Sequence, residues 1–318
     1  MRAVLLDTDD TYRITELDEP APAAGQVAIR VSHVGVQWGD VLVADGRFPV
    51  PRPFAPGFDV AGEIVAVGEG VDPGRVGERV SALTLSGGYA EVAVTSAELA
   101  LPVGELSPVE AAGFGWGGVT AYEVVHTVGR IRPGDAVLIH AAAGGVGTMA
   151  AQYARLAGAG RIVGVVGSAA KVEYATRFGY DEVVVGAQFP DQLRDQRFDL
   201  ILDSVGEPAS RANLGLLATH GRLVVFGNAG GGEEFTVSGS ELTYGNRAVL
   251  GYSSFTLAQS EPVLLGAAAR RALEPVLDGR VRVDVTARYP LAELDTAVRR
   301  LADRTSVGRT VIEIGKDA

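Results

Sequence analysis

The sequence predicts an α/β protein in which a doubly wound parallel sheet is inserted into a mostly β domain. In the first third of the chain, short β-rich stretches are separated by Pro and Gly clusters, whereas from about Tyr122 apolar strand-like runs alternate with helix-length segments. Strand-like segments then return near the end, which indicates that the last segment completes the first domain. A length of 318 residues agrees with about two domains.

Short strands account for the first part of the chain. Loops are marked by Pro20, Pro22 and Gly25 and by the Pro-rich run 49–57. The expected strands are Arg2–Leu6, Tyr12–Leu17, Gln26–Val36, Asp59–Val71, Val76–Leu83 and Tyr89–Val94.

The middle of the chain alternates strands and helices. Strands that are apolar on both faces, with helices between them, are typical of a parallel sheet covered on both sides. The expected strands are Ala136–His140, Arg161–Val166, Glu182–Val185, Phe198–Asp203, Arg222–Phe226 and Arg247–Tyr252, and the expected helices are Val146–Ala157, Ala169–Phe178, Asp191–Gln196 and Pro208–Ala218.

A helix over about Glu261–Leu277 and strands over Val281–Val285 and Thr310–Ile314 are expected to return the chain to the first domain. The predicted boundaries are residues 1–121 for the first part of a catalytic domain, 122–258 for a nucleotide-binding domain and 259–318 for the segment that completes the catalytic domain.

Composition narrows the possible functions. Lys and Arg total 28 against 39 Asp and Glu, a net charge of −11, which disfavours binding to nucleic acid or anionic lipid. The chain has no cysteine, so disulfides, thiolate zinc sites and cysteine nucleophiles are excluded. No apolar run is long enough for a membrane span, and the N-terminus reaches Asp7 too soon for a signal peptide. A cytoplasmic location is expected.

A glycine-rich turn follows the strand Ala136–His140. The run continues Ala141-Ala142-Ala143-Gly144-Gly145-Val146-Gly147 and leads into a helix, which fits a G-x-G-x-x-G fingerprint with Ala142 in the first position. Such a turn lets a diphosphate approach the backbone, and the helix N-terminus offers free N–H groups and partial positive charge. The candidate diphosphate-binding residues are Ala143, Gly144, Gly145, Val146 and Gly147.

The second strand of this domain indicates which nucleotide is bound. NAD sites usually place a carboxylate at its end, but here Gly167, Ser168 and Lys171 follow. A hydroxyl and an ammonium favour a 2′-phosphate, and therefore NADPH, although Ser168 could also be a helix N-cap and Lys171 a solvated surface residue. Phe226-Gly227-Asn228 follows a later strand and could contact the nicotinamide, or could be a plain turn.

These motifs resemble the zinc-free quinone oxidoreductases (zeta-crystallin-like proteins) of the medium-chain dehydrogenase/reductase superfamily. The similarity spans essentially the whole chain. It is carried by Gly35–Asp40, Pro56–Gly62, Val76–Val80, Gly87–Glu91, Gly118–Ala121, His140–Gly147, Asp203–Gly206 and Phe226–Asn228. The resemblance implies a GroES-like β domain with an inserted Rossmann domain, NADPH as cofactor and a homodimer.

The chain departs from its zinc-dependent relatives at the metal ligands. Gln37 stands where those relatives have Cys, and Phe58-Asp59 where they have His-Glu. The four histidines are scattered, so no metal site is expected. Quinone oxidoreductases usually carry Asn at the position of Gln37 and a Tyr near Gly186, and this chain has neither.

The predicted reaction is hydride transfer from NADPH to a quinone or α,β-unsaturated carbonyl without a metal. Gln37 and Thr120 are expected near the nicotinamide, with Asp40 orienting the pocket. Helix initiation is an alternative role for the segment from Gln37 to Asp40. Phe58 is expected to form an apolar wall, whereas Arg309 is left unassigned. Alternatives are a dedicated biosynthetic enoyl reductase or cyclisation enzyme, and a non-catalytic NADPH-binding protein.

Overall fold

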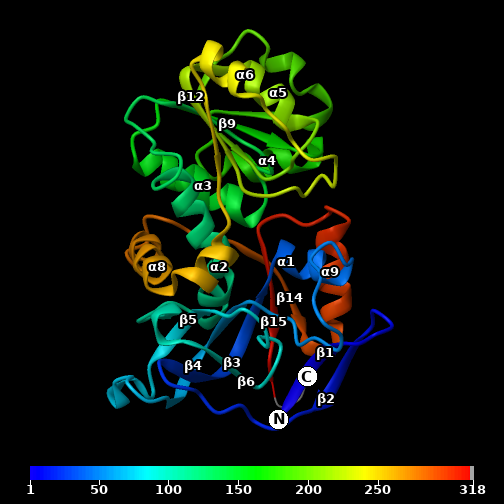
Figure 1. Cartoon of the computed structure of the whole chain (residues 1–318), viewed down its shortest axis with the longest axis vertical. Helices are drawn as coiled ribbons and strands as arrows, with labels where there is room; N and C mark the ends of the chain where they lie inside the picture. Colours follow the sequence, from blue (N-terminus) through cyan, green and yellow to red (C-terminus); the bar gives the residue numbers. More distant parts are fainter. Residues whose placement is uncertain (316–318) are drawn as a thin grey trace. The chain divides into compact units, whose positions relative to one another are not determined.

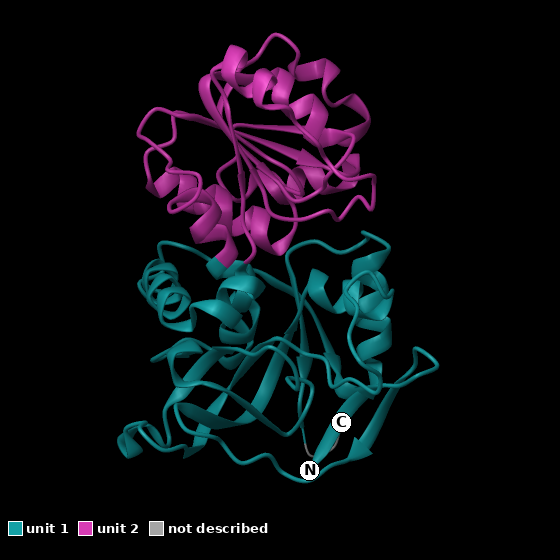
Figure 2. Ribbon diagram, viewed as in Figure 1, with its two compact units in different colours: residues 1–119, 254–318 teal, residues 120–253 magenta. Residues whose placement is uncertain are grey.

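The computed structural model describes residues 1–315, which form two compact units (Figures 1 and 2). Unit 1 comprises residues 1–119 and the described residues from 254 onward, and unit 2 comprises Thr120–Ser253. Unit 2 is therefore inserted in the sequence between the two segments that form unit 1. The catalytic and nucleotide-binding roles expected for residues 1–121, 122–258 and 259–318 stay predictions. No helix in the described part is long and apolar enough to cross a membrane.

A seven-stranded sheet forms the centre of unit 1. Its order is β14-β15-β3-β4-β5-β7, and β6 also pairs with β3. The strands are β3 (Gln26–Val36), β4 (Asp59–Val67), β5 (Arg79–Leu83), β6 (Val92–Ser96), β7 (Ala100–Pro102), β14 (Val285–Pro290) and β15 (Arg309–Glu313). Because β15 pairs antiparallel with β3, the end of the chain completes a sheet begun near its start. This agrees with the expected return to the first domain.

Helices complete unit 1, and apolar side chains from the sheet and from α9 form one of its cores. They are α1 (Trp38–Ala44), the first part of α2 (Pro108–Val125), α7 (Ser254–Ser260), α8 (Pro262–Leu277) and α9 (Leu294–Ala302). The helix α2 is kinked at Gly115 (φ 25°), where a Cβ atom would lie 2.4 Å from Cγ of Asp59. Only glycine allows this close approach.

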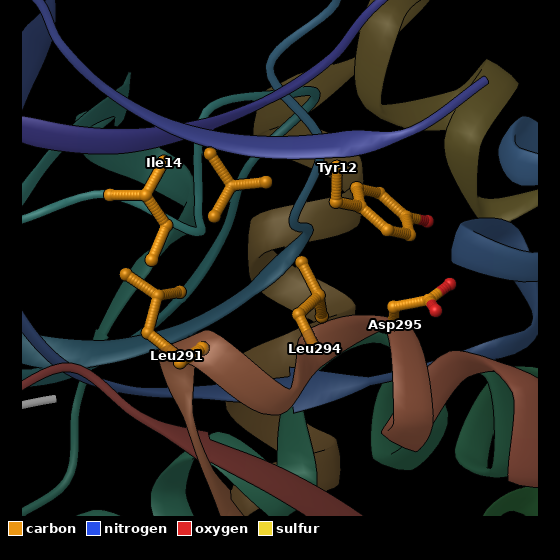
Figure 3. A pocket seen from close by; sticks show the side chains of 7 residues that line it. Tyr12, Ile14, Leu291, Leu294 and Asp295 are labelled. Atoms are coloured by element: carbon orange, nitrogen blue, oxygen red, sulfur yellow. The ribbon is translucent and has the colours of Figure 1, made fainter. Parts of the chain in front are cut away.

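A separate hairpin, β1 (Arg2–Leu6) and β2 (Tyr12–Glu16), packs against the start of α9. Between them lies a cavity of about 70 Å³, lined by Val4, Tyr12, Ile14, Leu291, Ala292, Leu294 and Asp295 (Figure 3). Ligand pockets usually measure about 300–1,000 Å³. This cavity is therefore too small for a dinucleotide or a quinone.

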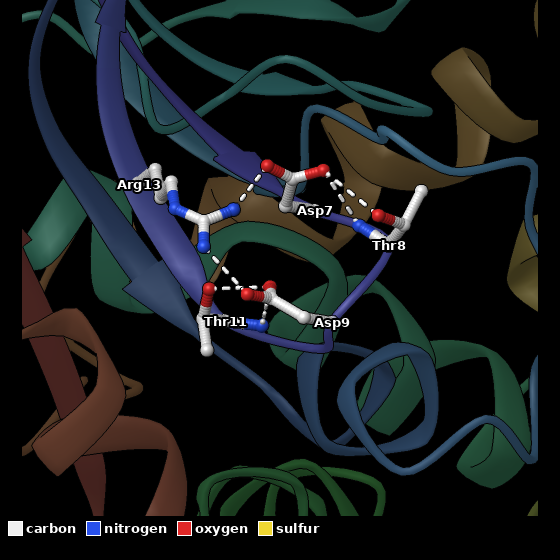
Figure 4. A network of polar contacts seen from close by, with 5 residues as sticks. All are labelled: Asp7, Thr8, Asp9, Thr11 and Arg13. Atoms are coloured by element: carbon white, nitrogen blue, oxygen red, sulfur yellow. Dashed lines mark hydrogen bonds and ion pairs between the residues drawn. The ribbon is translucent and has the colours of Figure 1, made fainter.

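The turn between β1 and β2 is closed by an exposed polar network (Figure 4). Arg13 pairs with Asp7 and, at 2.5 Å, with Asp9, whose other oxygen accepts a hydrogen bond of 2.6 Å from Thr11 Oγ1. Asp7 also accepts a 2.7 Å bond from the Thr8 N–H. These charges are solvated, so the network fixes the turn but contributes little to stability.

A six-stranded parallel sheet forms the centre of unit 2, in the order β10-β9-β8-β11-β12-β13. The strands are β8 (Ala136–Ile139), β9 (Arg161–Val166), β10 (Glu182–Val185), β11 (Phe198–Asp203), β12 (Leu217–Val225) and β13 (Ala248–Gly251), and the helices are α3 (Gly145–Leu156), α4 (Val172–Thr176), α5 (Ala209–Leu216) and α6 (Gly239–Gly245). The order reverses between β8 and β11, as in a doubly wound nucleotide-binding sheet. The predicted fold class is confirmed.

Several predicted elements were wrong in detail. Asp191–Gln196 forms only a 3₁₀ turn over Asp191–Leu193, because Leu193 is its one buried apolar residue. A strand was expected over Val281–Val285, and Val281 and Val283 are buried, but the strand begins only at Val285. The expected strand therefore overlaps β14 only at Val285, because the buried apolar residues that predicted it lie before the edge strand, in which half-buried and exposed residues alternate.

Candidate functional site

The glycine-rich turn of unit 2 joins β8 to α3 at the carboxyl end of the parallel sheet. Ala141 adopts a left-handed conformation (φ 51°), and the Ala142 N–H donates a 3.0 Å bond to the carbonyl of Val165 on β9. Gly144 is the N-cap of α3. A Cβ atom at Gly147 would lie 2.5 Å from the Ala141 oxygen, so the helix can pack this closely on the turn only with glycine. The first N–H groups of α3 are left available for an anion.

Within this turn, Ala143 is buried, whereas Gly144, Gly145 and Val146 are half-buried. The geometry therefore fits the cradle expected for a diphosphate: a side-chain-poor backbone that ends in a twelve-residue helix.

Ser168 and Lys171 lie on the short turn that follows β9, next to this cradle. Ser168 is exposed, and its side chain makes no capping hydrogen bond in the described structure, although the residue occupies an N-cap position. The Lys171 N–H donates a 3.1 Å bond to the Ser168 carbonyl, so both residues belong to one turn. A Cβ atom at Gly167 would meet no atom within 4 Å, which leaves space beside them.

Phe226, Gly227 and Asn228 follow β12 at the same edge of the sheet. Phe226 is half-buried, and the other two residues are exposed. The Asn228 side chain donates a 3.2 Å bond to the carbonyl of Gly232, which closes the loop. The three residues are therefore placed at the end of the sheet where ligands of such folds bind.

In unit 1, Gln37 begins α1 and Asp40 is fully buried beneath it. One Asp40 oxygen accepts a 2.9 Å bond from the Gln37 N–H and a 3.0 Å bond from the hydroxyl of Tyr89, whereas its other oxygen, Oδ1, is buried without a partner. Burial raises the pKa of Asp40 to about 7, although both hydrogen bonds favour the charged form. Helix initiation, the alternative considered for this segment, is thus observed.

The half-buried Gln37 side chain lies over the first turn of α1, because a Cβ atom at Gly39 would be 3.4 Å from Gln37 Cδ and Nε2. Tyr89, the partner of Asp40, was missed from the sequence. Its motif Gly87–Glu91 gave no indication that its ring reaches α1.

The positions that hold metal ligands in zinc-dependent relatives have a different chemistry here. Phe58 is 3% exposed. Asp59 is fully buried, forms an ion pair with Arg309 and accepts a 2.7 Å bond from the Trp116 N–H. The partner of Arg309 in this structure is therefore a carboxylate of unit 1. Among residues 1–315, no group of three or more His, Cys, Asp or Glu side chains is arranged to hold a metal ion.

Thr120 is half-buried on α2 and belongs to unit 2, whereas Gln37 and Asp40 belong to unit 1. The structure brings Gln37 and Asp40 together. The grouping of Thr120 with them stays a prediction.

Two family models match the chain: an alcohol dehydrogenase GroES-like domain over residues 23–128 and a zinc-binding dehydrogenase over residues 145–269. The synaptic vesicle membrane protein VAT-1 homolog of Rattus norvegicus is 30% identical over 322 residues, which cover 94% of this chain and 79% of the rat protein. The chain belongs to the medium-chain dehydrogenase/reductase superfamily. Within it, the chain falls in the quinone oxidoreductase and VAT-1-like family.

Solved structures of this medium-chain family superpose on the whole chain. The quinone oxidoreductase of Thermus thermophilus, also solved with NADPH, has a TM-score of 0.85 and 33% identity, covering 99% of this chain and 100% of that one. The Escherichia coli quinone oxidoreductase complexed with NADPH has a TM-score of 0.89 and 25% identity at the same coverage. The chain also aligns over 317 residues, at 32% identity, with phthioceranic/hydroxyphthioceranic acid synthase of Mycobacterium tuberculosis, of which it spans 15%.

Replacing Gly147 by Ala is expected to weaken NADPH binding by about tenfold or more, because the new methyl group must displace the turn from α3. Isothermal titration calorimetry would measure the loss. Gly215→Ala is the matched control, since a Cβ atom there would meet nothing within 4 Å. Equal affinities of the Gly147 and Gly215 variants would contradict the assignment of this turn.

Replacing Asp40 by Asn is expected to flatten the pH dependence of the stability of unit 1. The folded state holds the Asp40 proton up to about pH 7, whereas the pKa of a free Asp carboxyl is 3.8. The folded state therefore binds more protons between these values, and wild-type stability falls as the pH rises from about 4 to 7. The difference corresponds to at most about 4 kcal/mol.

Urea unfolding at pH 5 and pH 8, followed by tryptophan fluorescence, would measure this effect, because both tryptophans, Trp38 and Trp116, belong to unit 1. Asn cannot titrate, so the variant should gain stability relative to the wild type at pH 8. The exposed Asp18→Asn variant serves as control. Parallel pH curves for wild type and Asp40→Asn would refute the interpretation.

Proposed function

We propose that this protein is an NADPH-dependent oxidoreductase that reduces a quinone or an α,β-unsaturated carbonyl compound without a metal. The observation that carries the proposal is the glycine-rich turn between β8 and α3, together with Ser168 and Lys171 after β9. Two quinone oxidoreductases of the same family have been solved with NADPH, which supports the proposal.

The residues after β9 favour NADPH over NADH. Ser168 and Lys171 offer a hydroxyl and an ammonium group, and no carboxylate stands at the end of β9 to bind a ribose hydroxyl or repel a 2′-phosphate. The diphosphate would lie on Ala143, Gly144, Gly145, Val146 and Gly147, and the nicotinamide end would lie beside Phe226, Gly227 and Asn228.

Unit 1 holds a cluster of aromatic rings, and we propose that its exposed member, Phe48, faces the acceptor. The Phe255 ring centroid lies 5.1 Å from that of Phe48 and 6.3 Å from those of Phe58 and Trp116. Phe58 and Trp116 are buried, but Phe48 is 36% exposed. Flat conjugated acceptors suit such rings, because aromatic pairs gain energy beyond the area they bury.

A conjugated acceptor also suits the polar groups present. NADPH, when bound, would supply a hydride. An enone that accepted it at its β-carbon, or a quinone, would then carry negative charge on its carbonyl oxygen. Hydrogen-bond donors can stabilise that oxygen, and water can protonate it. We assign the donor role to the Gln37 amide of unit 1 and propose, separately, a substrate-binding role for Thr120 of unit 2. Asp40 holds the start of α1 and so positions Gln37.

A dedicated biosynthetic enoyl reductase is the second candidate, because the chain aligns over 317 residues with part of an acid synthase. A cyclisation enzyme with its own substrate and a non-catalytic NADPH-binding protein remain alternatives from the sequence.

We also propose a homodimer. The strand β13 forms one edge of its sheet, and its residues Ala248, Val249 and Leu250 are only half-buried despite being apolar. A second copy of the same edge would continue the sheet. The cytoplasmic location expected from the sequence stays a prediction.

Incubation with NADPH and a panel of acceptors is expected to give turnover with naphthoquinones and aryl enones and none with a simple ketone such as acetophenone. The decrease in absorbance of the reduced nicotinamide would measure it. Because the proposed reaction uses no metal, EDTA should leave the rate unchanged. Equal rates with ketones, or loss of activity in EDTA, would contradict the proposal. NADPH binding without any turnover would favour a dedicated substrate or a non-catalytic role.

Replacing Lys171 by Ala is expected to weaken NADPH binding by about ten- to a hundredfold, the range for loss of a charged hydrogen bond, and to leave NADH binding nearly unchanged. Fluorescence titration with each nucleotide would measure the two affinities. Arg177→Ala is the matched control. It also removes one positive charge from the segment after β9, but the exposed Arg177 side chain lies over the Tyr174 ring. An equal loss for both nucleotides would exclude a contact of Lys171 with the 2′-phosphate.

A further inference from the structure

Asp203, the last residue of β11, is fully buried in unit 2 and is surrounded by donors. Its Oδ1 accepts bonds of 2.8 Å and 3.1 Å from the N–H groups of Val205 and Gly206. Its Oδ2 accepts a 2.6 Å bond from the hydroxyl of Ser210 and a 3.0 Å bond from the side-chain amide of Asn213. Four donors thus compensate a carboxylate that has lost all contact with water.

The network continues to the glycine-rich turn. The Asn213 amide nitrogen donates to Asp203, so its oxygen is the group that accepts from His140 Nε2, at 2.9 Å. His140 is 3% exposed and directly precedes Ala141, the first residue of the turn, and Phe189 packs edge-on against its ring at 4.9 Å. A buried chain of hydrogen bonds therefore joins the end of β11 to the end of β8.

This chain of bonds spans the point where the strand order reverses. The neighbours β8 and β11 are the first and fourth strands of unit 2, and in such sheets a dinucleotide crosses from one half to the other above that junction. The turn after β8 is the proposed diphosphate-binding site. Ser168 and Lys171, after β9, lie on one side of it, and the residues after β11 and β12 lie on the other.

The loops after β11 and β12 are joined to each other by backbone bonds. The Phe226 N–H donates to the Asp203 carbonyl at 3.0 Å, Ala229 donates to Ser204 at 2.9 Å and Gly230 donates to Val205 at 2.7 Å. Asp203 holds the 205–206 backbone, and that loop in turn holds residues 226–230.

We propose that Asp203 is a positioning residue that fixes the loops for the nicotinamide half of NADPH relative to the diphosphate turn. The inference rests on the proposed nucleotide site. Asp203 itself has no exposed surface, so it acts through Asn213, His140 and the loop backbones rather than by contact with the nucleotide.

The experiment compares NADPH, which spans both halves of the site, with 2′,5′-ADP, which contains only the adenosine half and its 2′-phosphate. Asp203→Ala is expected to lower the affinity for NADPH by about tenfold or more, because several buried donors lose their acceptor, but that for 2′,5′-ADP by less than about twofold. Asp203→Asn should restore part of the NADPH affinity, since its oxygen can still accept from Val205 and Gly206. Calorimetric titration gives both constants.

Asn213→Ala keeps Asp203 and its backbone bonds but cuts the link to His140, so it should show the same selective loss at smaller size. If Asp203→Ala does not fold, the Asn213→Ala variant still tests the inference. Asp195→Asn is the control, because that side chain is 97% exposed. Equal losses for the two ligands, or no loss in either variant, would overturn the inference. A wild-type protein that binds neither ligand would instead overturn the nucleotide site of the proposed function.

Discussion

Both units depend on carboxylates that are removed from water. Asp40, Asp59 and Asp203 have no exposed surface, and a buried charge is tolerated only where donors or an opposite charge replace its hydration. Asp59 pairs with Arg309, which is 250 positions away in the chain, and so links the start of β4 to the start of β15. Unit 1, which is interrupted by unit 2, is closed by this pair and by the pairing of β15 with β3. Removing either partner would leave an uncompensated charge inside the unit.

The need to compensate a buried charge also accounts for the residues that this chain has at the metal-ligand positions of zinc-dependent relatives. In place of those ligands, this chain has an aromatic ring at Phe58 and an ion-paired carboxylate at Asp59. The Trp116 indole donates a 3.0 Å bond to the Phe58 carbonyl, and its backbone N–H donates to Asp59. The kink at Gly115 brings α2 close enough for the backbone contact. Aromatic packing and charge pairing thus stabilise this region.

Local patterns in the sequence were sufficient for much of the fold, whereas the residues expected to bind the nucleotide stay a prediction. The strands Arg161–Val166, Glu182–Val185 and Phe198–Asp203 were predicted with the bounds observed, because both faces are covered and the runs are largely apolar. The edge strand β14 was predicted only at its first residue, Val285, because the apolar residues Val281 and Val283 are buried ahead of the strand rather than in it. Contacts such as Asp40 with Tyr89 and Asp59 with Arg309 could not be predicted, since they join residues that only the folded chain brings together. Asp203 is the last residue of the predicted buried strand Phe198–Asp203. A carboxylate at the end of such a strand was the one local indication of its hydrogen-bond network.

The buried carboxylates have different surroundings in the two units. In unit 2 the network around Asp203 joins three loops that follow adjacent strands. In unit 1, by contrast, Asp40 and Asp59 lie beneath the surface, and the partly exposed Phe48 stands on a loop after α1. Residues on such loops can change without disturbing the buried charges. Under the proposed function, the Phe48 loop that we expect to face the acceptor can therefore vary in this chain while the buried carboxylates, which are costly to move, stay in place.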